Sequence, residues 1–147
     1  MDANSRLNDL ITVTGRLVEL LTRENEALRN HQSKQVHELL DEKTALSRVY
    51  ETRFKTLADN PEMLQETDPA LREQLKELAV SVETLMDENA RLLRAAIDAN
   101  RRVVDLIAEA VRKQQPSAGT YSSEAVTSTD GSNAAGQRVA FSVDQNL

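Results

Sequence analysis

Histidines are the side chains in this sequence best suited to hold a metal ion, and the chain has two, His31 and His37. They lie six residues apart, whereas two metal ligands on one helix face need i,i+3 or i,i+4 spacing. Leu28 and Lys34 stand three residues before them, so the Glu-x-x-His motif of helical di-iron proteins is absent. The spacing therefore predicts no metal site.

Carboxylates are the other groups that could do acid–base chemistry. They are interleaved with Arg and Lys, as at Glu24, Glu26, Glu38, Asp41 and Glu42. Such interleaving is typical of a solvated charged helix face. The sequence has no glycine-rich phosphate loop and no nucleophile motif. We therefore expect a protein that is not an enzyme and that takes no cofactor.

The composition points to long amphipathic helices. Of 147 residues, 29% are charged and only 3% are aromatic, which suits helices better than a sheet-based core. The net charge of −6 argues against a nucleic-acid partner. The absence of cysteine excludes disulfides and favours a reducing cytosol. No apolar stretch approaches the roughly 18 residues of a membrane span, and the N-terminus lacks the pattern of a signal peptide. We therefore expect a cytoplasmic protein without membrane insertion.

Apolar periodicity predicts an all-α fold, a long antiparallel helical hairpin over residues 1–115. Its first helix is expected over about residues 5–58, its connector over 59–68 and its second helix over about 69–115. A connector this short makes the two helices antiparallel neighbours.

Capping residues mark the ends of these helices. Asn4 or Ser5 is expected to cap the first helix. Asn60 and Asp68 each place a capping side chain before a proline at a first helical position, so one short helical turn is expected after Pro61.

The last segment, residues 116–147, is rich in Ser, Thr, Ala, Gly, Asn and Gln. It cannot bury enough apolar surface to offset the entropy of ordering, which predicts a disordered tail. Within it, Tyr121 is an isolated aromatic residue. The alternating Val139–Val143 stretch could dock on a partner, or both features could be ordinary tail residues.

The second helix carries a heptad seam, the signature of a helix packed along a partner helix. The seam consists of Leu71, Leu75, Leu78, Val82, Leu85, Asn89, Leu92, Ala96, Ala99, Val103, Leu106 and Ala110. Its polar member, Asn89, is expected to fix the register of the helices. From Met86 onward a second stripe lies about 100° further round the helix. This stripe consists of Met86, Leu93, Ile97, Val104, Ile107 and Val111. We call the two stripes together, from Met86 to Val111, the wide face.

The hairpin register predicts what the wide face meets. If Leu57 faces Leu71, the segment Leu92–Leu106 faces the largely polar Thr22–Val36, which is ill suited to cover it. In the same register the seam residues Leu78, Val82 and Leu85 lie opposite Leu46, Val49 and Tyr50. The wide face is therefore expected to receive an amphipathic helix from another protein. One alternative is that Ala96 and Ala99 draw the two helices close and that Leu7–Leu21 or a dimer covers the rest of the face. Another is a structural coiled-coil scaffold or adaptor that self-associates through this face, with a homodimer as one form.

The sequence resembles the FlgN-type flagellar export chaperones. In the first helix the resemblance lies in Leu17-Val-Glu-Leu-Leu21, Glu24-Asn-Glu-Ala-Leu28, Leu39-Leu40 and Lys43-x-x-Leu46. In the second helix and the tail it lies in Asn89-x-x-Leu92-Leu93, Asn100-x-x-Val103, Gly119-Thr-Tyr121-Ser and the closing Ser142-Val-Asp-Gln-Asn-Leu147.

This resemblance implies a cytosolic, non-enzymatic chaperone that binds hook-associated flagellar proteins through their amphipathic terminal helices. It further implies delivery of these clients to the flagellar export gate at the inner membrane, on which an aromatic tail residue docks. The expected gate-docking residue is Tyr121. The expected client-binding residues are Met86, Leu93, Ile97, Asn100, Val104, Ile107 and Val111.

Overall fold

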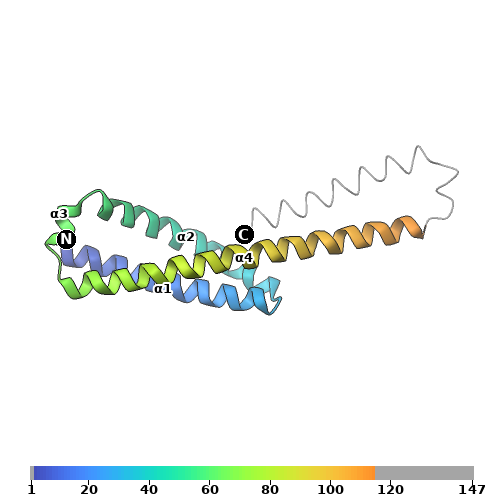
Figure 1. The fold of residues 1–147 in the computed structure, drawn as a ribbon, viewed down its shortest axis with the longest axis horizontal. Coiled ribbons are helices and arrows are strands. Elements are labelled where there is room, and N and C mark those ends of the chain that lie inside the picture. Colours follow the sequence, from blue (N-terminus) through green and yellow to red (C-terminus); the bar gives the residue numbers. More distant parts are fainter. Residues whose placement is uncertain (1, 115–147) are drawn as a thin grey trace. The chain divides into compact units, whose positions relative to one another are not determined.

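The structure, a computed structural model, describes residues 2–114. The expected tail, with Tyr121 and Val139–Val143, lies outside the described residues. Within residues 2–114 there are four helices and no strand, so the all-α prediction is confirmed. Figure 1 labels these helices α1 to α4 along the chain.

Helix α1 (Ala3–Arg29) begins at an aspartate cap. The Ser5 backbone N–H donates to the Asp2 carboxylate at 2.7 Å, and hydrogen bonding to Ser5 lowers the pKa of this carboxyl. The prediction of Asn4 or Ser5 as the cap is therefore wrong. The Asp2 carboxylate, which precedes both residues, already accepts a hydrogen bond from the free Ser5 N–H at the start of the helix. Asn4 instead accepts a hydrogen bond from the Asp68 N–H at 2.9 Å, which ties the start of α1 to the segment that precedes α4.

The predicted first helix is interrupted after Arg29, and α2 (Ser33–Ala58) begins after three intervening residues. His31 has a φ of 56°, in the left-handed region. Its N–H donates to the Leu28 carbonyl, and the Gln32 N–H donates to the Ala27 carbonyl at 2.8 Å. These two bonds form a Schellman motif, which satisfies carbonyls at the end of α1 and reverses the chain. The prediction of one continuous helix over 5–58 is wrong here.

The connector and the second helix agree with the sequence. After Ala58 comes the short helix α3 (Pro61–Gln65), followed by α4 (Pro69–Lys113). The Ala70 N–H donates to the Asp68 carboxylate at 2.9 Å, as the predicted cap requires. Asn60 does not cap α3, because its amide donates back to the Thr56 carbonyl at 2.8 Å.

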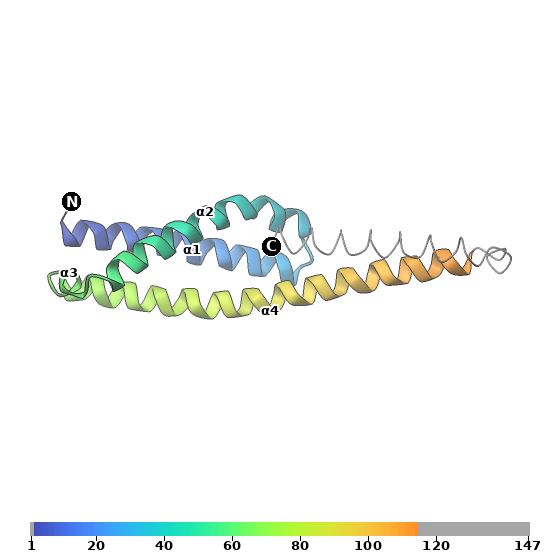
Figure 2. The same cartoon turned by 90° about the horizontal axis from the view of Figure 1, so that it is seen from above.

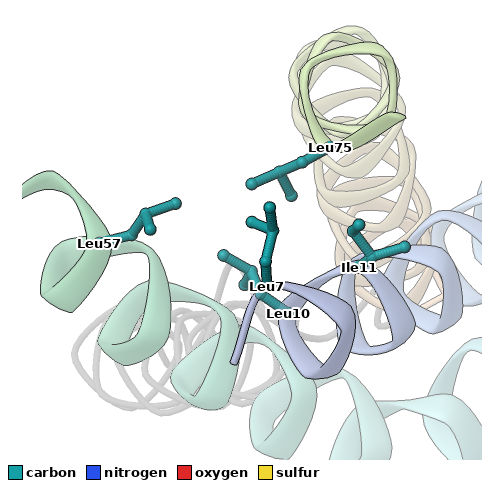
Figure 3. Close-up of a cluster of buried hydrophobic side chains, with 5 residues drawn as sticks. All are labelled: Leu7, Leu10, Ile11, Leu57 and Leu75. Carbon is teal, nitrogen blue, oxygen red and sulfur yellow. The ribbon is translucent and has the colours of Figure 1, made fainter. Parts of the chain in front are cut away.

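The chain divides after Leu92 into two units. In the first unit, α1, α2 and the first half of α4 run side by side (Figures 1 and 2). Leu7 of α1 and Leu57 of α2 share a buried cluster with Leu75 of α4, and Leu10 and Ile11 complete it (Figure 3). The three helices therefore enclose one apolar core, in which α2 runs antiparallel to the other two.

A second buried cluster continues this core along the helices. It contains Leu17, Leu21 and Val82, with Leu46, Tyr50 and Leu85 packed against it. The predicted register between α2 and α4 is thus confirmed for Leu46 and Tyr50. Val49 is 37% exposed and does not join the cluster.

A layer of buried polar side chains closes the core. The Lys43 ammonium of α2 donates to the Glu24 carboxylate of α1 at 3.0 Å and to the Asn89 amide oxygen of α4 at 2.9 Å. Asn89 donates to the Asn25 amide oxygen at 2.9 Å, and Asn25 donates to the Leu85 carbonyl at 3.2 Å. These directed bonds fix the register of three helices at once, which confirms the structural role predicted for Asn89.

Two sequence-based interpretations fail at this layer. Glu24 is only 2% exposed, so it does not belong to a solvated face, because Lys43 neutralises it inside the bundle. The polar segment around Asn25 does not lie opposite Leu92–Leu106. The reversal after Arg29 instead places Asn25 against Leu85 and Asn89 and pairs Arg29 with Glu88.

Candidate functional site

The expected client-binding residues all lie on α4, at spacings of seven, four and three residues that keep them on one helix face. Met86 is 41% exposed, and Ile107 and Val111 are 59% and 51% exposed. Asn100 is exposed, whereas Leu93, Ile97 and Val104 are half-buried. The helix therefore aligns these residues in one stripe, most open in its last turns. Tyr121, the expected gate-docking residue, lies outside the described residues.

The structure adds seam residues to this surface. Val103 and Leu106 are 54% and 65% exposed, although the heptad pattern places them on the side that packs against a partner helix. Together with Ile107 and Val111 they make a broad aliphatic surface on the last turns of α4. The signal in the sequence was the pattern itself, which continues to Ala110 after the buried part of the seam has ended.

The first unit carries a separate apolar groove between α2 and α4. It encloses about 900 Å³ and contains exposed large side chains, namely Phe54 of α2 and Val80 and Met86 of α4. We call it the α2–α4 groove. Sequence reasoning missed it because Val80 lies outside both stripes of α4, and no motif in the sequence singles out Phe54.

Aromatic and charged side chains shape this groove. The rings of Tyr50 and Phe54, one turn apart on α2, lie 5.5 Å apart between their centroids. Burial raises the pKa of Tyr50, and the negative charge of Glu83 raises it further. Arg72, Glu73 and Lys76 line the part of the groove near the start of α4, and Glu83 lines the part further along. The groove thus carries two cations and one anion near the start of α4 and one anion further along.

Two further kinds of site, a metal centre and a membrane span, have no candidate among the described residues. Residues 2–114 contain no group of three or more His, Asp or Glu side chains placed to hold a metal ion. Among the helices in this part of the chain, none combines the length and the apolar content that crossing a membrane requires.

Comparison with known proteins gives one line of similarity. Over 120 residues the chain is 24% identical to a protein of Caulobacter vibrioides named flagellar basal-body protein FlbY. The aligned part covers 82% of this chain and 80% of that protein. No protein-family model matches the chain, and no solved structure matches it. The similarity supports a flagellum-associated family, which is the coarser part of the resemblance seen in the sequence.

Proposed function

We propose that this protein is a cytosolic export chaperone of the flagellum, which binds an amphipathic terminal helix of hook-associated proteins on the wide face of α4. The observation that carries the proposal is the exposed aliphatic surface of Val103, Leu106, Ile107 and Val111, each more than half exposed. Burying a side chain of this size contributes roughly 1.5–3 kcal/mol, so a helix laid along the surface gains substantial binding energy. The similarity to a flagellar basal-body protein supports the cellular context.

The proposed mechanism is shielding. A client helix that exposes its own apolar stripe would aggregate before secretion, and the wide face offers a complementary stripe at the same 3–4 residue spacing. Small seam residues, Ala99 and Ala110, leave room for a close approach of the client backbone. Release of the client at the export machinery would then require only that the client helix leave the wide face for another surface.

The experiment is a calorimetric titration of a purified hook-associated protein from the same organism. The variant carries Ile107→Asp together with Val111→Asp, which should abolish binding and leave helicity intact because both side chains are exposed. The control is Arg112→Asp, which makes the net charge more negative by the same amount, but on the opposite face of α4. Equal binding by both variants would reject the proposal. A dimer that only the first variant splits would favour the scaffold.

We further propose that Tyr121 docks on the flagellar export gate while the wide face holds a client. The support is the family resemblance, together with the large contact area and few torsions of a tyrosine. Tyr121→Ala should weaken gate binding and leave client affinity unchanged. Unchanged gate binding would remove Tyr121 from the mechanism.

A further inference from the structure

The α2–α4 groove has the form of a second helix-binding surface. Its floor is apolar, and Phe54, Val80 and Met86 are 37%, 56% and 41% exposed although they are large and hydrophobic. Exposed apolar patches of this kind on a folded unit are typical of protein-binding sites. The apolar residues of α2 form one wall of the groove and those of α4 form the other. The apolar face of a helix fits between two such walls.

The charges on the rim indicate what kind of helix would fit. Near the start of α4 the rim carries two cations, Arg72 and Lys76, and one anion, Glu73. Near Met86 it carries the anion Glu83. None of these four side chains forms an ion pair with another residue of the described part of the chain.

We propose that the α2–α4 groove receives an amphipathic helix whose apolar residues recur every three to four positions, with acidic residues beside Arg72 and Lys76 and basic residues beside Glu83. The order of charges sets the direction in which the helix lies. When the acidic residues occupy the C-terminal half of the helix, its carbonyl end, which carries partial negative charge, also points toward the two cations. The groove is thus a surface distinct from the last turns of α4.

The proposed function supplies only the identity of the occupant, a helix of an export client, and the preference for a helix of this charge order stands on the groove itself. Met86 lines the groove and, by sequence, also begins the second stripe of α4. The test separates the surfaces by removing one of them.

The probe is a designed helical peptide with leucines at i, i+3, i+4 and i+7 spacing. Its flanking residues are glutamates in the C-terminal half and lysines in the N-terminal half. Two further peptides carry only glutamates or only lysines. Affinities are measured by fluorescence anisotropy with the full chain in the Ile107→Asp, Val111→Asp background, so the last turns of α4 do not contribute. The mixed peptide should bind about threefold to tenfold more tightly than either uniform peptide.

A matched pair of substitutions locates the binding. Val80→Asp in the groove should weaken binding of the mixed peptide about tenfold or more, because it places a charge on the apolar floor. Val103→Asp makes the same change on the same helix at nearly equal exposure, 54% against 56%, and should leave the affinity within about twofold. Glu83→Lys should shift the preference to the all-glutamate peptide.

Several results would overturn the proposal. These are equal effects of Val80→Asp and Val103→Asp, equal affinity for the three peptides, or binding by the wild type that vanishes in the background variant. A dimer of the chain that Val80→Asp splits would also overturn it, since a second copy would then cover the groove. Failure of the proposed function would show differently, as a client titration unaffected by Ile107→Asp and Val111→Asp.

Discussion

The same heptad seam is buried in one half of α4 and open in the other. In residues 69–92, Leu75, Val82 and Asn89 are 5%, 5% and 3% exposed. In residues 93–113, Val103 and Leu106 of the same seam are 54% and 65% exposed. A heptad pattern therefore identifies the face that binds a helix but leaves the partner open. In the first region the partners are α1 and α2, and in the second we propose a client.

The largest expected effect comes from truncating the seam in each region. Leu75→Ala should lower the free energy of unfolding by about 2–5 kcal/mol, because Leu75 is buried among Leu7, Leu10 and Leu57. Leu106→Ala should change it by less than about 0.5 kcal/mol, since this side chain is 65% exposed. Urea denaturation followed by circular dichroism measures both. Equal losses would erase the difference between the regions.

The two lysine–carboxylate pairs sharpen the same contrast. Lys43 and Glu24 form a pair with side-chain exposures of 12% and 3%, whereas Lys113 and Glu109 are 77% and 60% exposed. Lys43→Met should cost about 3 kcal/mol, because it leaves the Glu24 charge buried without its cation. Lys113→Met should cost less than about 0.5 kcal/mol.

A double variant checks the physical cause. Glu24 already has one buried oxygen, Oε2, without a hydrogen-bond partner in residues 2–114. Adding Glu24→Gln to Lys43→Met removes the uncompensated charge and should restore part of the lost stability. If it restores none, packing of the lysine stem, and not charge, holds this layer together.

The chain reversal that makes α1 and α2 separate partners of α4 gives a smaller effect. His31→Gly should stabilise the protein by about 0.5–1 kcal/mol, because glycine adopts the left-handed conformation of residue 31 without steric cost. His37→Gly, inside α2, should destabilise it by about 1 kcal/mol. Thermal melts would show shifts of opposite sign, and shifts of the same sign would argue against a turn at His31.

The smallest effect concerns the titration of Tyr50 in the α2–α4 groove. Burial, assisted by Glu83, raises the pKa of Tyr50 above its ordinary value of 10.0. The stability associated with its neutral form is therefore fully present below pH 10 and is lost as the pH rises through the pKa of the folded state. Ultraviolet titration in a Tyr121→Phe background should show this raised pKa, and Glu83→Gln should lower it. An unchanged pKa of Tyr50 in the Glu83→Gln variant would show that the charge of Glu83 does not act on Tyr50.

Local chemistry explains which parts of the fold the sequence predicts. Asp68 and Pro69 mark the start of α4, because a capping carboxylate directly before a proline is typical of the first residues of a helix. The break after Arg29 is harder to predict, because its left-handed residue is His31 and not glycine. The available signal is the run of seven polar residues from Arg29 to Gln35, about two turns of helix without an apolar contact.

The candidate site is predictable only in part for a related reason. Periodicity places Ile107 and Val111 on one face of α4, where the structure has them exposed. It places Val103 and Leu106 both on the packing seam and on the wide face, since a pattern cannot show where the partner helices end. Buried polar residues such as Glu24 and Asn25 look like surface residues in sequence, because only the fold brings Lys43 and Asn89 to them.

Thiol labelling tests most directly whether the seam of α4 changes from a core to a free binding surface. The chain has no cysteine, so Leu75→Cys and Leu106→Cys each provide a single thiol. We expect Leu106→Cys to react with maleimide about as fast as a thiol in an unfolded peptide, and a purified hook-associated protein to protect it. Leu75→Cys should react far more slowly, with or without the client. Fast labelling at both positions, or slow labelling of Leu106→Cys in the free protein, would contradict the account.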